Sequence, residues 1–213
     1  MFGYIVKELS EHSPFTLFGA LTGILLMMIF KNMPHEIAHG IFYVFHPAHV
    51  FLSAMVTTAL YCQYRPDSRS LKKVWKVILI GFVGSVGVGT LSDSLIPLWG
   101  EQLLDMGNPE PHIGFIEKWW IVNPIAVAGI FVAYNFPFTK YPHALHVLVS
   151  TWASLFHMMM AQNPGDAIPY FGVFIFLFLG VWFPCCCSDI IFPLLFVRKP
   201  EDILKKECSF CGH

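Results

Sequence analysis

The sequence predicts an all-α integral membrane protein with six transmembrane helices, arranged as two inverted three-helix repeats. Of its 213 residues, 55% are hydrophobic and only 13% are charged, and the mean hydropathy is +0.60. Soluble domains carry about twice this fraction of charge. Most of the chain falls in apolar runs of membrane-spanning length. A set of internal sequence matches then divides the runs into two halves.

The matches occur in the same order in both halves and indicate an internal duplication. HPAHVFLSAMVTTALY is echoed by HALHVLVSTWASLFHM, with His, His, Val and Ser at the same spacing. Ser-Asp-x-x-x-Pro-Leu also occurs twice, as does a shorter Asn-x-Pro motif. The matched pairs are residues 46–61 with 143–158, 92–98 with 188–194, and 32–34 with 135–137.

Six apolar segments follow one another along the chain, three in each repeat. They are residues 14–33, 40–61, 74–99, 119–136, 144–161 and 170–197. Repeat one covers about 14–99, repeat two about 119–197, and 198–213 is a short tail, so residues 1–213 form a single transmembrane domain. Gly81, Gly84 and Gly87 in the third segment are spaced for close helix packing.

Loop charges predict the orientation in a plasma or inner membrane. The loop after the second segment and the C-terminal tail are basic, whereas the loop that holds Glu101 and Glu117 is acidic. Basic loops stay in the cytoplasm, so both termini are expected there. The expected partners are the lipid bilayer and a small ion or solute, and a homo-oligomer is left open. No nucleic-acid partner is expected, because the sequence has no basic stripe.

Three spans per repeat make the second repeat cross the bilayer in the opposite direction, as in many transporters and channels. Polar residues recur every three or four positions in the second and fifth segments, so they share one face of each helix. These residues are His46, His49, Ser53 and Thr57 in the second segment, and His143, His146, Ser150, Ser154 and His157 in the fifth. Such a stripe must face the bundle interior or water.

The histidine pairs and a duplicated aspartate are candidate metal ligands. Two imidazoles and a carboxylate suit zinc, manganese, iron, cobalt or nickel. The expected outer set is His46, His49 and Asp93, and the expected inner set is His143, His146 and Asp189. The same groups also suit proton transfer or hydrogen bonds between helices.

Other motifs offer competing interpretations. His35-Glu36-Ile37-Ala38-His39 fits H-E-x-x-H and resembles the signature of membrane-embedded metalloproteases. That resemblance implies zinc held by His35 and His39, with Glu36 activating water. The spaced histidines also resemble the His boxes of di-iron membrane oxygenases, whose boxes converge on one face. The expected topology places HPAH and HALH on opposite faces, which argues against a single di-iron centre. The tail places Cys208, Cys211 and His213 at metal-ligand spacing.

We therefore expect a transporter or channel for a small solute, above all a divalent metal cation. The ion would pass between the two sets of ligands. The residues expected to line its path are Ser53, Thr57, Ser150, Ser154 and His157. An intramembrane metal-dependent hydrolase of the H-E-x-x-H type is the alternative, and a channel for monovalent ions or a neutral solute is the third. Transport is favoured over catalysis, and no P-loop or nucleophile elbow indicates ATP hydrolysis or serine chemistry.

Overall fold

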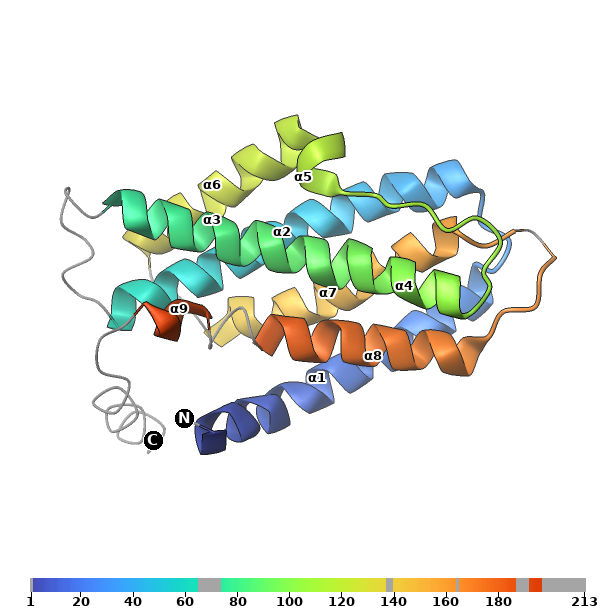
Figure 1. Cartoon of the computed structure of the whole chain (residues 1–213), viewed down its shortest axis with the longest axis horizontal. Helices are drawn as coiled ribbons and strands as arrows, with labels where there is room; N and C mark the ends of the chain where they lie inside the picture. The colour runs from blue at the N-terminus through green and yellow to red at the C-terminus, as the bar shows by residue number, and fades with distance from the viewer. Residues whose placement is uncertain (1, 65–73, 137–139, 164, 187–191, 197–213) are drawn as a thin grey trace.

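The computed structural model describes residues 2–64, 74–136, 140–163, 165–186 and 192–196, and every regular element within them is helical (Figure 1). The predicted all-α class is confirmed for this part of the chain. The helices are α1 (Phe2–Ile29), α2 (His35–Tyr64), α3 (Val74–Thr90), α4 (Ile96–Leu103), α5 (Gly114–Glu117), α6 (Trp119–Asn135), α7 (Lys140–Met160), α8 (Tyr170–Cys186) and α9 (Phe192–Leu195). A π-helical turn, η3 (Leu91–Leu95), joins α3 to α4.

Helices α3, η3 and α4 form one continuous rod, and Pro97 explains its irregular turn. In η3 the amide of Ile96 donates to the carbonyl of Leu91, five residues back. The next bond in that pattern would join residue 97 to Ser92, but proline has no N–H to donate. The carbonyl of Ser92 instead accepts a hydrogen bond from Ser154 Oγ of α7 at 2.9 Å. Pro97 therefore frees a backbone acceptor that ties the rod to α7.

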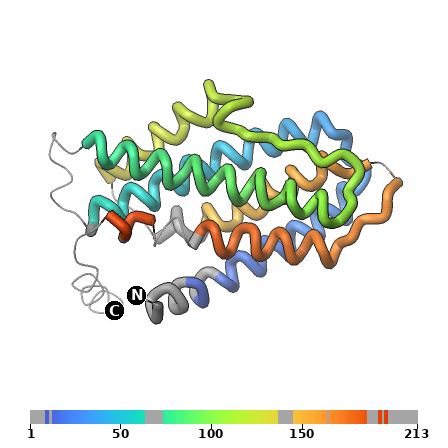
Figure 2. The backbone as a smooth tube through the Cα atoms, viewed as in Figure 1, coloured from blue at the N-terminus to red at the C-terminus, as the bar shows by residue number. Residues whose placement is uncertain are grey.

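Helices α2 and α7 lie side by side in the middle of the bundle and run in opposite directions (Figure 2). Helices α3 and α6 pack against α2, and helices α1 and α8 pack against α7. In Figure 1, α1, α2 and α3 run to the right, left and right, whereas α6, α7 and α8 run to the left, right and left. The first helix of each half thus packs on the other half, α1 on α7 and α8, and α6 on α2 and α3.

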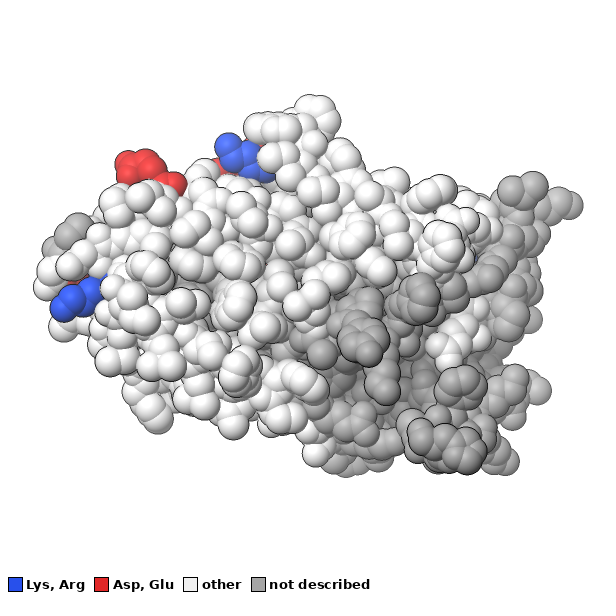
Figure 3. All heavy atoms as spheres, turned by 180° about the vertical axis from the view of Figure 1, so that it is seen from behind, with Lys and Arg blue, Asp and Glu red and all other residues white. Residues whose placement is uncertain are grey.

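Large apolar side chains point out of the bundle at helical spacing. On α8, Phe171, Ile175, Leu179 and Phe183 are exposed at intervals of four residues. The face seen in Figure 3 is nearly free of charged atoms over its described middle, and the charged atoms in view lie along the upper edge and at the left end. Two described helical stretches, His35–Gln63 and Val74–Leu103, are long and apolar enough to cross a membrane, and four shorter helices are also apolar.

The helices extend beyond the second and third apolar segments at two places. Helix α2 begins at His35 and not near residue 40, so His35 and His39 share a helix with His46 and His49. The histidine pair therefore lies well inside α2 rather than at its start. Glu101, expected in an exposed acidic loop, belongs to α4 and is fully buried.

The crossing of α6 and α2 depends on a glycine. A Cβ atom at Gly129 would lie 2.5 Å from the carbonyl oxygen of Phe51 and 3.0 Å from Cβ of Ala54. Because the first contact is backbone, Gly129→Ala must push the helices apart, and we expect it to lower the free energy of unfolding by about 1–3 kcal/mol. The measurement is thermal or denaturant unfolding followed by circular dichroism.

Gly87→Ala is the matched control, because a Cβ atom there meets nothing within 4 Å. It should leave stability unchanged or raise it by up to about 1 kcal/mol, the helix-propensity gain of alanine over glycine. If Gly129→Ala unfolds like the wild type, α2 and α6 do not approach as closely as described.

Candidate metal centre

The buried carboxylate of Asp93 joins the two histidines of the predicted outer set. Asp93 lies in η3 and is 0% exposed. Its Oδ2 is 3.0 Å from Nδ1 of His46 and 2.7 Å from Nδ1 of His49, both on α2. Since an ionised carboxylate only accepts hydrogen bonds, each imidazole presents its Nδ1–H to Asp93 and leaves its Nε2 directed elsewhere. The structure thus brings together the predicted residues His46, His49 and Asp93.

The second oxygen of Asp93 is bound by hydroxyl groups from both halves of the chain. Oδ1 accepts hydrogen bonds from Ser92 Oγ at 2.8 Å and from Ser150 Oγ of α7 at 2.7 Å. Both oxygens of the carboxylate are therefore satisfied without contact with water. A buried charge is tolerated only when it is hydrogen-bonded in this way.

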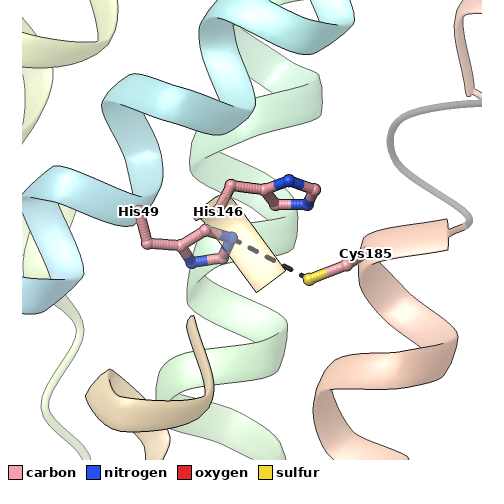
Figure 4. A group of neighbouring side chains, drawn as sticks. All are labelled: His49, His146 and Cys185. Atoms are coloured by element: carbon pink, nitrogen blue, oxygen red, sulfur yellow. Dashed lines mark hydrogen bonds between the residues drawn. The ribbon is translucent and has the colours of Figure 1, made fainter. Parts of the chain in front are cut away.

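Three donor groups meet beside Asp93, one from each of α2, α7 and α8 (Figure 4). The rings of His49 and His146 are stacked, with centroids 5.7 Å apart and planes inclined by 14°. Sγ of Cys185 lies 3.9 Å from Nε2 of His49. One ligand atom from each of the three residues lies within 4.8 Å of the other two, and all three side chains are buried. These residues could hold a metal ion.

The hydrogen bond to Asp93 prepares His49 for this role. A ligating histidine commonly donates its other ring N–H to a carboxylate, which fixes the tautomer and raises the basicity of the ligand nitrogen. Two imidazoles and a thiolate suit zinc and similar borderline cations, whereas magnesium and calcium prefer oxygen ligands. Three protein ligands also leave one position of a tetrahedral ion open for water or a solute.

The predicted division into an outer and an inner ligand set is wrong for His146. Because α2 and α7 cross as antiparallel neighbours, His146 stacks on His49 instead of lying on the opposite side of the bundle. The side chain of His143 and all of Asp189 lie outside the described residues, so their metal-binding role stays a prediction. The cysteines and histidine of the tail also lie outside the described residues.

The predicted path residues on α2 and α7 are buried. Ser150 donates a hydrogen bond to the carboxylate of Asp93, and Ser154 donates one to the carbonyl oxygen of Ser92. Ser53 and Thr57 are buried, and their hydroxyls have no hydrogen-bond partner within the described part of the chain.

Sequence reasoning placed neither Cys185 nor Glu101 beside the histidines of the core. Cys185 belongs to a run of three cysteines in the last apolar segment, but no spacing rule connects that run to the histidine pairs. Glu101 was assigned to a loop, yet its Oε1 lies 2.7 Å from Nδ1 of His157 in the buried core. The predicted path residue His157 is thus paired with a carboxylate that the sequence did not suggest.

A second donor cluster lies at the end of the bundle where α2 begins. Nε2 of His39 is 3.2 Å from Oε1 of Glu117, and Nδ1 of His112 is 3.2 Å from Oε2. Ligand atoms of these three residues also lie within 4.8 Å of one another. Burial lowers the pKa of His112. Burial acts to raise the pKa of Glu117, but the hydrogen bonds from His39 and His112 act in the opposite direction, and the pKa is lowered.

The arrangement differs from the one that H-E-x-x-H implies. His35 stacks on His39 with ring centroids 6.0 Å apart, but its Nδ1 lies 3.2 Å from the carbonyl oxygen of Met160. Glu36 is exposed and forms no hydrogen bond with any residue that the structure describes. The candidate ligand set that contains His39 is therefore completed by His112 and Glu117, and it does not include His35.

Comparison with protein-family models, with curated proteins and with solved structures found no match. The functional conclusion rests on the geometry of these donor groups and on the sequence.

The thiol of Cys185 gives the centre a spectroscopic signature. When Co²⁺ is added to metal-free protein, we expect a thiolate-to-cobalt charge-transfer band that Cys185→Ser abolishes, because serine supplies no sulfur ligand. The protein should carry no polyhistidine tag, and Cys208 and Cys211 should be replaced by serine in all samples.

Cys62→Ser is the matched control, because Cys62 is also a buried thiol of the core but belongs to a different hydrophobic cluster. It should keep the band. A band that survives Cys185→Ser, or that disappears with Cys62→Ser, would contradict the assignment.

Proposed function

We propose that this chain is an integral membrane protein that moves a divalent transition-metal cation, and that His49, His146 and Cys185 hold the ion in the middle of the bundle. One observation carries the proposal. The buried donors come from both halves of the chain, His49 from the first and His146 and Cys185 from the second. A site shared in this way changes its geometry whenever the two halves move relative to each other.

The distribution of polar and apolar side chains supports a membrane location. The exposed faces of α1 and α8 carry apolar stripes, whereas buried histidine, serine, threonine and carboxylate side chains lie among the apolar residues of the interior. Lipid cannot satisfy polar groups, so polar side chains of membrane helices face inward. In this proposal α1, α2, the α3–α4 rod, α6, α7 and α8 are the six spans, and the basic loop and tail keep both termini in the cytoplasm.

The packing of the helices supports inverted repeats. The directions of α1, α2 and α3 are reversed in α6, α7 and α8 (Figure 1). His49 and His146 occupy equivalent positions in the two matched sequences, and their rings stack where α2 and α7 cross. Transporters built from inverted repeats commonly bind their solutes near the bilayer midplane, at the interface of the repeats.

The geometry suggests how binding and release would occur. Asp93 orients His49 through Nδ1, and His146 and Cys185 complete the ligand set from α7 and α8. If the halves rock apart, the ion loses ligands from one side and can be exchanged. A conducting site must bind strongly enough to admit the ion and weakly enough to release it. The hydroxyls of Ser53 and Thr57, one and two turns beyond His49 on α2, offer the next polar contacts.

A metal-dependent enzyme is the second candidate, because three protein ligands with one open position are also the arrangement of catalytic zinc. Such an enzyme would use the core centre, since Glu36 makes no contact that would make it a base in the described structure. Flux of the ion through the protein separates the two candidates, because an enzyme retains its metal through many turnovers.

Zinc flux into proteoliposomes tests the proposal. We expect Asp93→Asn to lower flux by at least about 10-fold, because loss of a carboxylate behind a ligating histidine typically costs 10–100-fold in metal affinity or activity. A His49→Ala/His146→Ala variant should abolish zinc flux. Asp105→Asn is the matched control, because Asp105 is exposed and its positive φ of 54° suits asparagine.

The outcomes distinguish the remaining candidates. Potassium flux that persists in the His49→Ala/His146→Ala variant would favour a channel for monovalent ions. Tight zinc binding without zinc flux would favour the enzyme. Equal loss of zinc flux in Asp93→Asn and Asp105→Asn would reject a specific role for Asp93.

The membrane location has its own test. The full-length protein should stay with the membrane pellet after alkaline carbonate extraction, because release would expose its apolar helix faces to water. Release into the supernatant would refute integration into the bilayer and, with it, the transport mechanism.

A further inference from the structure

His39, His112 and Glu117 converge at the end of the bundle from two separate parts of the chain. His39 lies in the first turns of α2, His112 precedes α5, and Glu117 is the last residue of α5. Helix α5 packs against α2, α3 and α6, so its position is fixed by the bundle.

The carboxylate of Glu117 is placed between the two imidazoles. Each of its oxygens faces one ring nitrogen at 3.2 Å. The neighbouring Lys118 does not neutralise this carboxylate, since its ammonium lies over the rings of Tyr43 and Trp120, 5.5 Å from each centroid. The side chains of His39 and Glu117 are 26% and 36% exposed, so the cluster is open to solvent, unlike the core centre.

We propose that His39, His112 and Glu117 form a second, solvent-accessible site for a divalent cation of the zinc class. Two imidazoles and one carboxylate form a common zinc ligand set, and the remaining coordination positions would be filled by water. The set contains no sulfur, so it binds more weakly to soft cations than the core centre does.

Buried polar atoms connect this site with the core. His112 Nε2, His157 Nε2 and His46 Nε2 are buried without a hydrogen-bond partner in the described ranges, as is one oxygen of Glu101. The three imidazoles surround the ring of Phe42, with centroids 5.2 Å away for His46, 5.4 Å for His157 and 6.4 Å for His112. Buried polar atoms without protein partners are usually satisfied by water or a ligand.

Imidazole rings lead from the surface to the metal centre, and the ring of Phe42 lies between His157 and His46. His112 lies 5.5 Å from His157 by ring centroids, Phe42 lies against both His157 and His46, and His46 shares Asp93 with His49. The second site is therefore placed to capture a cation before it moves inward. This role in capture rests on the proposed function, whereas cation binding at the second site does not.

Metal stoichiometry tests the second site. Tag-free full-length protein in detergent, with Cys208 and Cys211 replaced by serine, is titrated with Co²⁺ by calorimetry and absorption. The wild type should bind one equivalent more than His39→Ala/Glu117→Gln and one more than His49→Ala/His146→Ala. The His39→Ala/Glu117→Gln variant should keep the thiolate charge-transfer band of the core centre, which also reports that it is folded.

His35→Ala is the decisive control. H-E-x-x-H ligation requires His35, whereas the cluster described above does not use it, so His35→Ala should bind as many equivalents as the wild type. Loss of an equivalent in His35→Ala, or full binding in His39→Ala/Glu117→Gln, would overturn the second site. If the thiolate band is absent from the wild type while His39→Ala/Glu117→Gln still loses an equivalent, the second site stands and the proposed core centre fails.

Discussion

The rest of the structure depends on how the carboxylate of Asp93 is kept inside the bundle. An ionised carboxylate removed from water costs several kcal/mol unless its oxygens are hydrogen-bonded. Here His46 and His49 bind one oxygen, and Ser92 and Ser150 bind the other. The donors come from α2, η3 and α7, and Ser150 is the donor from the second half of the chain, so a movement of α7 away from α2 and η3 would leave Oδ1 bound by Ser92 alone.

The π-helical turn makes this arrangement possible. Single π-helical turns are rare and frequently mark functional sites. In this chain the missing N–H of Pro97 leaves the Ser92 carbonyl for Ser154, while the side chains of Ser92 and Asp93 both turn toward the core. A local consequence of one proline thus sets both the backbone contact and the side-chain contact between the α3–α4 rod and α7.

Much of the fold and part of the centre could be predicted from the sequence. Long apolar runs predicted helices, and the spacing of His46 and His49 placed both on one face of a helix. The match between the halves identified Asp93 as their partner. Helical periodicity does not fix the position along each helix at which two helices cross, so the stacking of His49 on His146 was not predicted. Glu101 and His157 are 56 residues apart, and only tertiary packing makes them a pair. The residues around Glu117 have no periodic pattern to interpret.

The thiol beside the stacked histidines makes the two halves chemically unequal. Aligning Ser92 with Ser188 places Gly89 in the first half opposite Cys185 in the second. A Cβ atom at Gly89 would lie 3.6 Å from Cε1 of His46 and 3.9 Å from Nδ1 of His49, so the two positions occupy comparable places beside the histidines. With His49 and His146 alone, each half would supply one ligand to the ion. The thiolate of Cys185 gives the second half an additional ligand, so an ion would be bound more strongly by that half. The two halves would therefore differ in how strongly they bind the ion because of their ligands, even where their backbones are arranged alike.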